Sequence, residues 1–411
     1  MKIKSIVAMC AGASLVGAAS HAMAQAAPVK PTYEIQGGDS SNDESAPKGI
    51  ELQDGLRLFS FANLSVGKDD NLFLNNTAKK SSNLYLFNPG LRLVAKSDGM
   101  QLSVDYDAKV ARYHSSSDDN YQDQRLKAAG DFSFSSKVGL RLSGLYEQGH
   151  DPRGSTDRVG GAKPDEFDNS GANALFAYGG NDAAGRLEFA AGSLKKRYTN
   201  NRLSTVATDH NTDNFAGRFF VRVASKTSLF LEVREDKLDY PLVTSLQDSK
   251  ERRYLVGATW DATAATSGTV KLGQIRKDFV SPAIKDYSGT GWEGNIQWSP
   301  LSYSKFDFFT SKSFVESTGL GDFILNKRYG VAWNHEWDSR LSSTFSYSRA
   351  DDIFSGNPRV DTTDTTGFKL SYKPTRWLSL GGEYTHTSRD SNFGAAIYKK
   401  NLYMFTVSAA L

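Results

Sequence analysis

The stretch that decides the fold class runs from Gln101 to Tyr113 and reads QLSVDYDAKVARY. Alternate positions in it separate an apolar set of side chains from a polar set. The two sets are Leu102, Val104, Tyr106, Ala108 and Val110, and Gln101, Ser103, Asp105, Asp107 and Lys109. Only a repeat of two residues separates them in this way, whereas the 3.6-residue repeat of a helix would mix them. The segment therefore predicts a β-strand with one apolar face and one polar face.

The same alternation returns from residue 54 to the end of the chain. It is clear in Val138–Glu147, in Asn214–Val223 and in the final segment 397–411. It is weakest at 267–279, where Gln274 and Ile275 interrupt it. The segments add up to about eighteen strands, which is an even number typical of a bacterial outer-membrane barrel.

The connections between these segments alternate between short and long. Lys96–Gly99 and Ser299–Pro300 have the residue types of tight turns, while Gly149–Phe167 and Leu238–Lys250 are long and polar. Short turns at one end and long loops at the other are typical of an outer-membrane barrel. We therefore predict an all-β fold, a transmembrane antiparallel up-and-down β-barrel of about eighteen strands with both termini periplasmic.

A soluble β-sandwich is the alternative architecture, and the tryptophans argue against it. Trp260, Trp298, Trp337 and Trp377 all lie near short turns. In a barrel that position is one of the aromatic girdles at the bilayer interface, whereas in a sandwich the same residues would be core residues. Past the N-terminal segment no apolar run approaches the roughly twenty residues of a membrane-spanning helix. A membrane location would therefore require strands, and strands in lipid must close into a barrel.

The N-terminal residues predict export from the cytoplasm. Lys2 and Lys4 precede an apolar stretch that ends in Ala22-Met23-Ala24, so residues 1–24 have the pattern of a secretory signal peptide. Residues 25–53 are polar and lack periodicity, which predicts a flexible periplasmic leader before a barrel at 54–411. This leader could plug the barrel or contact a periplasmic export partner.

Composition excludes several classes of function. The only cysteine, Cys10, leaves with the signal peptide, so disulfides and thiol chemistry are excluded. Without Lys2 and Lys4 the chain has 47 basic residues against 46 acidic ones, and such a balance does not predict nucleic-acid binding. The histidines lack the spacing of a metal site, and we predict no cofactor.

A hydrolytic role is the least favoured of the alternatives. His114 with the serines that follow it, and His386 with Ser388, are the visible serine–histidine candidates. A catalytic serine needs its base within hydrogen-bond reach and a third group that orients that base. Neighbours in sequence do not establish such a triad, so we predict that the protein is not an enzyme.

Several segments resemble a known family. They are the signal peptide, the strand start Leu56-Arg57-Leu58, the segment Asp69-Asp70-Asn71, the loop Gly149-His150-Asp151-Pro152-Arg153-Gly154 and the series of alternating strands. Together they resemble the putative β-barrel porin family found among outer-membrane proteins of exopolysaccharide biosynthesis operons. The resemblance covers nearly the whole mature chain. It implies a bacterial outer-membrane protein that takes part in polysaccharide export.

The polar face of the predicted strands supplies the candidate functional residues. We predict that the following charged side chains line a water-filled lumen: Asp105, Asp107, Lys109, Arg141, Arg186, Glu188, Arg218, Arg222, Glu232, Arg234, Glu293, Lys305, Asp307, Lys369, Lys373 and Glu383. Mixed charges can let a hydrated polymer pass, because conduction needs weak and distributed contacts. Arg218, Arg222 and Arg234 could also form a basic patch for uronic-acid or phosphate groups. The aromatic residues Phe220, Phe230 and Phe309 interrupt this wall, either as packing residues or as stacking platforms for sugars.

The sequence thus predicts an outer-membrane pore, with export of an exopolysaccharide as the leading function. A general or solute-specific diffusion porin is the alternative. The expected partners are outer-membrane lipids and lipopolysaccharide, together with a polysaccharide or a small polar solute.

Overall fold

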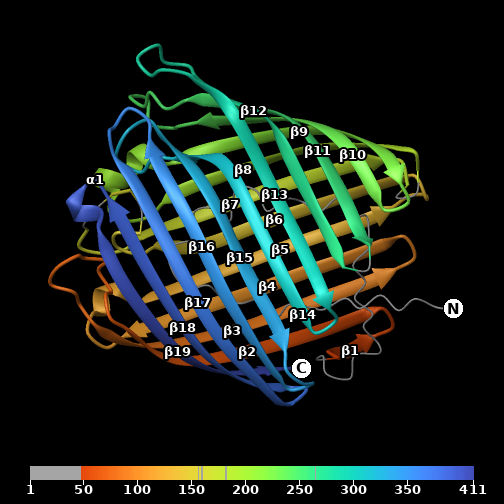
Figure 1. Cartoon of the computed structure of the whole chain (residues 1–411), viewed down its shortest axis with the longest axis horizontal. Coiled ribbons are helices and arrows are strands. Elements are labelled where there is room, and N and C mark those ends of the chain that lie inside the picture. The colour runs from red at the N-terminus through yellow and green to blue at the C-terminus, as the bar shows by residue number, and fades with distance from the viewer. Residues whose placement is uncertain (1–47, 156, 159–160, 181–182, 264) are drawn as a thin grey trace.

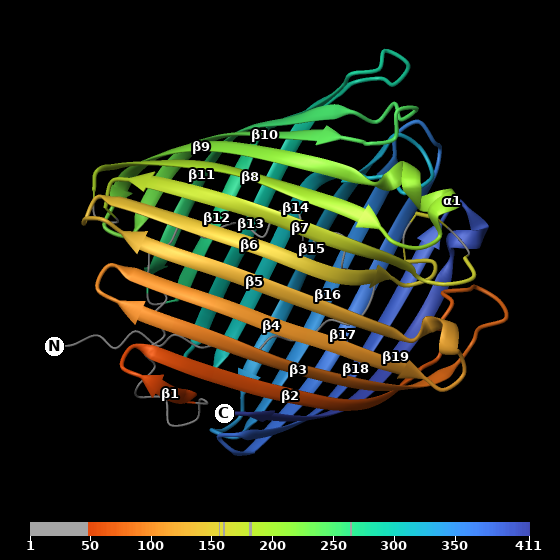
Figure 2. The same ribbon diagram turned by 180° about the vertical axis from the view of Figure 1, so that it is seen from behind.

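Strand pairing closes into a ring in this chain. The computed structural model describes residues 48–411 except 156, 159–160, 181–182 and 264. Each strand from β2 to β18 pairs antiparallel with the next strand along the chain, and β19 returns to pair with β2 from Leu402↔Asp69 to Ala410↔Phe61. The result is a closed barrel of eighteen antiparallel strands, as the sequence predicted (Figures 1 and 2).

The strands are long enough to cross a bilayer when tilted. Their bounds are β2 (Leu56–Asp69), β3 (Ser82–Ser97), β4 (Met100–Tyr113), β5 (Tyr121–Ser133), β6 (Val138–Asp151), β7 (Asp165–Tyr178), β8 (Gly185–Tyr198), β9 (His210–Ala224), β10 (Thr227–Asp239), β11 (Ser249–Thr263), β12 (Thr266–Phe279), β13 (Tyr287–Leu301), β14 (Ser304–Glu316), β15 (Phe323–Glu336), β16 (Leu341–Phe354), β17 (Val360–Thr375), β18 (Leu378–Ser391) and β19 (Tyr398–Ala410).

The predicted signal peptide and most of the predicted leader lie outside the described residues. The end of the leader is an exception, because Ile50–Gln53 forms a short exposed strand, β1, that makes a hairpin with β2. Gly55 in the connecting turn has φ +75°, a left-handed conformation that favours glycine. The chain therefore becomes regular slightly before the barrel wall begins.

The two ends of the barrel differ as the sequence predicted. One end carries short turns such as Ala224–Thr227 and Leu301–Ser304, together with the start of β2 and the end of β19. The other end carries the long loops. These loops include helix α1 (Arg202–Thr205) and 3-10 turns at Ser117–Asp119, Val206–Thr208 and Gly394–Ala396. Among the described residues, none of the helices is long and apolar enough to span a membrane. The periplasmic placement of the short-turn end remains a prediction.

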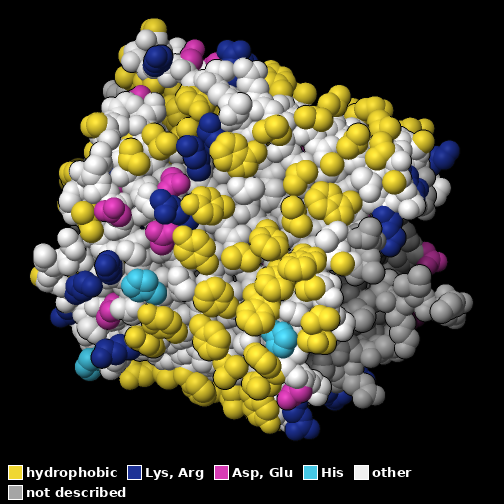
Figure 3. Space-filling view, viewed as in Figure 1, with side chains coloured by type: hydrophobic (Ala, Val, Ile, Leu, Met, Phe, Trp, Pro, Cys, Tyr) yellow, Lys and Arg dark blue, Asp and Glu magenta, His cyan; other side chains and the backbone are white. Residues whose placement is uncertain are grey.

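One face of every strand points away from the barrel and is apolar. Large exposed hydrophobic residues follow each other across neighbouring strands, including Val66, Phe87, Val104, Leu126, Leu142, Phe189, Phe219, Leu231, Val256, Leu272, Phe345, Phe368 and Phe405. Figure 3 shows hydrophobic side chains across the middle of one outer face, with charged side chains gathered mainly toward the long-loop end. Trp298, Trp337 and Trp377 are exposed near the short-turn end, in accordance with an aromatic girdle.

The wall overlaps itself where β13 meets β14. The ladder between these strands runs only from Leu301↔Ser304 to Glu293↔Ser311, so their long-loop halves are not paired with each other. Phe314 has the same parity on β14 as the outward-facing Phe308, yet its ring lies 5.5 Å from that of Tyr287. Tyr287 shares the inward parity of Glu293 on β13. The long-loop ends of β14 and β15 therefore lie inside β12 and β13.

The overlap encloses a small apolar core. Ile275 on β12 clusters with Phe314, Phe323 and Leu325, and all four are buried. Ile275 has the inward parity of Lys271 and Lys277 on β12, so its position would face water in a simple barrel. It meets protein instead. This explains why the alternation is interrupted at Gln274 and Ile275, although the strand itself forms as predicted.

Replacing Ile275 by alanine should test the overlap. The change removes three buried carbon atoms from an enclosed cluster, and we expect a loss of about 2–5 kcal/mol in the free energy of unfolding. Thr365→Ala is the matched control, because Thr365 is an inward-facing and only half-buried residue of β17. Urea unfolding of the two variants in phospholipid vesicles, followed by tryptophan fluorescence, makes the comparison. Equal, small effects would mean that Ile275 faces an open lumen.

Candidate functional site

The inner surface of the barrel collects the charged residues that the sequence singled out. All sixteen predicted lining residues occupy positions of their strands that alternate with the exposed hydrophobic residues. The inner surface is not uniform, however. One wall, formed by β8 to β14, carries a dense network of buried charges, while the wall formed by β16 to β18 is rich in hydroxyl groups.

The buried charges of the first wall form one connected set, which we call the ion ladder. Six cations and six carboxylates take part, and none of their side chains is more than 17% exposed. The members are Arg186, Glu188, Arg218, Glu232, Arg234, Asp236, Glu251, Arg253, Lys271, Lys277, Glu293 and Glu316. Because the two signs are equal in number, the ladder has no net charge.

Cross-strand register creates the centre of the ladder. Glu188, Arg218 and Glu232 lie directly opposite one another on β8, β9 and β10, and opposite charges in such positions stabilise a sheet. Arg218 donates from Nε to Glu232 Oε2 over 2.6 Å and from Nη1 to Glu188 Oε2 over 3.3 Å. Lys271 Nζ lies 3.2 Å from the same Glu232 carboxylate. Glu232 is thus a buried hub for cations of three strands.

The end of the ion ladder at Lys277 and Glu316 links β12 to the overlapping end of β14. Lys277, fully buried on β12, donates to Glu251 over 3.0 Å and to Glu316 over 2.6 Å. Glu316 ends β14, inside the outer layer. Tyr240, just beyond β10, donates a hydrogen bond from its hydroxyl group to Glu316 Oε2. Burial together with this carboxylate raises the pKa of Tyr240 well above its usual value, so the hydroxyl stays protonated and remains a donor.

The predicted basic patch does not exist as a free cationic surface. Arg218 and Arg234 both pair with Glu232. Arg222 lies near the short-turn end, where its guanidinium donates to the carbonyl oxygens of Ala224 and Ser225. The prediction was wrong because carboxylates already neutralise two of the three arginines. Arg218 pairs with carboxylates on the neighbouring strands β8 and β10, whereas Arg234 pairs with Glu232 on its own strand and with Glu293 on β13.

Other predicted lining residues form more open pairs. Asp105 Oδ1 lies 3.4 Å from Arg92 Nε, and Asp107 Oδ1 lies 3.1 Å from Arg125 Nε. Arg141 donates two hydrogen bonds to Asp131. These side chains are 18–41% exposed, so water screens their charges more strongly than those of the ladder.

The remaining predicted residues are distributed around the wall. Asp307 accepts hydrogen bonds from the side chains of Gln297 and Asn334, and Lys305 is the inward position that precedes it on β14. Lys369 lies opposite Glu383 on β17 and β18, and Lys109 lies opposite Asp123. Lys373 is exposed next to the short turn after β17.

The second wall offers hydroxyl groups to the interior. Half-buried serine and threonine side chains occupy inward positions of three adjacent strands, namely Ser346, Ser348, Thr363, Thr365, Ser371 and Thr387. Hydroxyl groups both donate and accept hydrogen bonds, so this wall can exchange partners with water or with a hydroxylated ligand.

The inward aromatic residues divide into two kinds. Phe220 and Phe230 are buried, with ring centroids 4.9 Å apart, and the Phe230 ring covers Gly257. They are packing residues. Phe309 also covers a glycine, Gly330, but more than a third of its surface is exposed. It is therefore the one of the three that could stack against a ligand.

The described residues of the loop between β6 and β7 are 152–155, 157–158 and 161–164, and we call them the crossing loop because Asp157 contacts loops on the far side of the long-loop end. The Asp157 carboxylate accepts hydrogen bonds from the backbone of Thr318 and Leu320 and from the Ser317 hydroxyl, at 2.9–3.1 Å. The Asp157 carbonyl accepts a bond from Arg359 Nη1 over 2.6 Å. These partners precede β15 and β17, about half-way round the ring from β6. Loops from opposite sides therefore meet over the opening.

The segment from Gly149 to Gly154, noted in the sequence analysis, anchors the start of the crossing loop. His150 Nδ1 lies 2.9 Å from Asp123 Oδ1, and Asp151 accepts the Tyr198 hydroxyl bond over 2.8 Å. Arg153 pairs with the buried Asp119 and lies 3.9 Å above the ring of Phe73. The residues thus serve to anchor the loop.

Sequence reasoning missed half of the ion ladder. Lys271 and Lys277 lie in the strand whose alternation was weak, and Glu316 follows the short ladder of β14. Glu251 and Arg253 belong to a regular inward series on β11, so their spacing could have identified them. Asp236, two residues beyond Arg234, could have been found in the same way.

One of the two serine–histidine candidates, His386 with Ser388, has a different hydrogen-bond partner for its ring. Nδ1 of His386 lies 2.8 Å from Asn401 Oδ1 rather than at Ser388. In the part of the chain that the structure describes, no three His, Cys, Asp or Glu side chains are grouped as metal ligands.

Comparison with known proteins identifies the type of barrel. A family model described as putative β-barrel porin 2 matches residues 57–411. The fold is similar to that of the FrpB iron transporter from Neisseria meningitidis (F3-3 variant), with 13% identity, a TM-score of 0.45 and coverage of 83% of this chain but only 64% of that one. No curated protein matches the chain.

Two further solved structures are similar at the level of the barrel. OccAB3 from Acinetobacter baumannii has 11% identity and a TM-score of 0.49, over 87% of this chain and 100% of that one. A bacterial polysaccharide outer membrane secretin has 10% identity and a TM-score of 0.39, over 85% and 98%.

Neutralising Glu232 should lower the stability of the barrel, because the ion ladder depends on its carboxylate. Glu232→Gln leaves three buried cations without their shared carboxylate, and breaking a buried pair costs roughly 3–5 kcal/mol of stability. Asp105→Asn, in a more exposed pair, should cost less than about 1 kcal/mol. Urea unfolding in vesicles measures both changes. If the two variants are equally stable, water already screens the ladder.

Proposed function

We propose, on the premise that this chain belongs to the putative β-barrel porin 2 family, that it exports an exopolysaccharide of low charge. The protein is a porin-like β-barrel of the bacterial outer membrane. The finer assignment concerns the cargo and its direction. The proposal about the cargo rests on the chemistry of the barrel interior. We take the predicted lining residues as the surface that the cargo contacts during passage.

The observation that carries this proposal is the pairing of a neutral charged wall with a hydroxyl-rich wall. Every cation of the ion ladder has a carboxylate neighbour, so the ladder presents no net field that would retain an anionic or a cationic chain. The hydroxyl-rich wall provides Thr363, Thr365 and Thr387 as exchangeable partners for sugar hydroxyls. Such contacts are weak and distributed, as conduction requires.

A solute-specific diffusion porin is the second candidate, and the crossing loop favours it. A loop held over the opening restricts passage to small solutes, unless it moves. In an exporter the same loop would open when polymer arrives. Both functions are passive transport, and under neither is the protein an enzyme. The predicted periplasmic partner of residues 25–53 also stays a proposal, since residues 25–47 lie outside the described part of the chain.

A deletion strain distinguishes the two candidates. Loss of an exporter should trap polymer in the periplasm, and expression of the wild-type chain should restore its release. Loss of a diffusion porin should leave polymer release unchanged and reduce the uptake of a small solute. Normal secretion in the deletion strain would contradict the export proposal.

Releasing the crossing loop should increase conduction. Asp157→Ala removes the acceptor of the bonds from Ser317, Thr318 and Leu320, each contributing about 0.5–1.5 kcal/mol, so openings should become at least about 10-fold more frequent. Single-channel recording in planar bilayers measures this frequency. Ser155→Ala is the control, because the Ser155 hydroxyl donates a hydrogen bond within the same loop, to the Pro152 carbonyl. Unchanged gating in Asp157→Ala would show that the loop does not limit passage.

A further inference from the structure

A hollow on the outer face of the barrel lies over β17, β18, β19, β2 and β3. Its volume is about 630 Å³. Most of its lining side chains belong to the outward-facing sets of their strands, among them Leu370, Tyr384, Tyr403 and Phe405. The hollow therefore opens toward lipid rather than toward the interior.

A missing side chain creates the hollow. Gly382 lies directly between Leu370 on β17 and Phe405 on β19, at an outward position. A Cβ atom placed on Gly382 would meet no other atom within 4 Å. The large neighbours thus surround an unfilled space in the apolar band.

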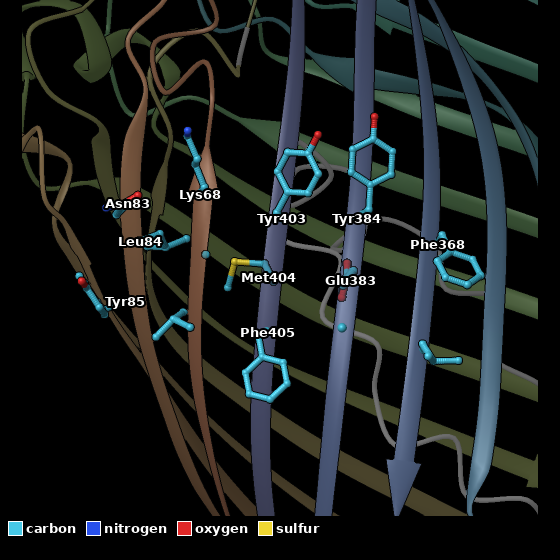
Figure 4. A pocket seen from close by; sticks show the side chains of 14 residues that line it. Lys68, Asn83, Leu84, Tyr85, Phe368, Glu383, Tyr384, Tyr403, Met404 and Phe405 are labelled. Atoms are coloured by element: carbon cyan, nitrogen blue, oxygen red, sulfur yellow. The ribbon is translucent and has the colours of Figure 1, made fainter.

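One end of the hollow is polar and positively charged. In Figure 4 the amino group of Lys68 and the hydroxyl groups of Tyr384 and Tyr403 point toward the same end, while Phe405 lies toward the other end. Lys68 is exposed. Its adjacent carboxylates are engaged elsewhere, since Asp69 pairs with Lys400 and Asp70 accepts bonds from Asn401.

The polar end is also the end nearer the long loops. Lys68 is the penultimate residue of β2, next to the loop that follows it, and exposed Lys399 on β19 adds a second cation on the same side. In a bacterial outer-membrane barrel the long loops face the outside of the cell. The hollow is thus apolar along its length and positively charged at its long-loop end. A ligand that matches it has acyl chains for the apolar part and an anionic group for Lys68.

We propose that the hollow binds one molecule of the phosphorylated glycolipid of the outer leaflet, with a phosphate at Lys68 and an acyl chain over Gly382. The placement in the outer membrane is a premise of this inference, whereas the identity of the transported cargo is not. Charge complementarity selects the anionic lipid, because a zwitterionic lipid would bring its own cation to the lysine. The site thus holds a lipid at the seam where β19 closes the barrel on β2.

Native mass spectrometry of the detergent-solubilised full chain, with added bis-phosphorylated lipid A, tests the proposal. Lys68→Gln should lower lipid retention about fivefold, as expected for loss of one exposed charge contact. Gly382→Leu should lower it by a similar factor, because the new side chain occupies the space of the acyl chain. Retention of lipid A without phosphates should fall in wild type and should not respond to Lys68→Gln.

Two control variants separate the site from a general effect of the surface. Lys195→Gln removes another exposed lysine near the long-loop end, on β8. Gly217→Leu adds a side chain at another outward glycine, on β9, where an added Cβ atom would make only an ordinary contact of 3.9 Å with the Phe189 ring. Both should retain lipid A as wild type does. Equal retention by all four variants, or equal retention of phosphatidylethanolamine and lipid A, would overturn the proposal. Because the readout is lipid mass, a failed export assay would leave it unaffected.

Discussion

Every feature of this barrel depends on the requirement that backbone N–H and C=O groups find partners inside a medium that offers none. A sheet with free edges cannot satisfy them there, so the ladder has to return from β19 to β2. Once the ring is closed, each strand has one face toward lipid and one toward the interior. The alternation of side chains, the ion ladder and the outer hollow all follow from that division.

The interior then faces a second physical problem, which is how to keep charge on a wall that is largely buried. The ladder solves it with cross-strand pairs in register, as at Glu188, Arg218 and Glu232. Removing an ion from water is costly, and only close partners of opposite sign offset that cost. The charges are therefore arranged as a balanced set, and the surface remains polar without attracting one sign of solute.

Sequence reasoning recovered what depends on local solvent and missed what depends on partners across space. The alternation in Gln101–Tyr113 reports directly on lipid and water, so strand number, turn order and the inward position of the charged residues could be predicted. The cross-strand partners of Arg218 could not be predicted, because the sequence of one strand does not give its register with the next strand. The Glu232 partner of Arg234, by contrast, lies two residues before it on the same strand. The overlap at β13 and β14 left only one trace in the sequence, the interruption at Ile275, and the contacts of Asp157 half-way round the ring left none.

The ion ladder also bears on the habitats in which the channel can operate. Mobile ions weaken interactions between exposed charges over about 10 Å at moderate salt, but they penetrate poorly between buried partners that already touch. The field inside this wall is set by fixed neighbours such as Lys271 and Glu293, 2.9 Å apart, rather than by the surrounding electrolyte. The same passage therefore keeps its electrical character in fresh and in saline water.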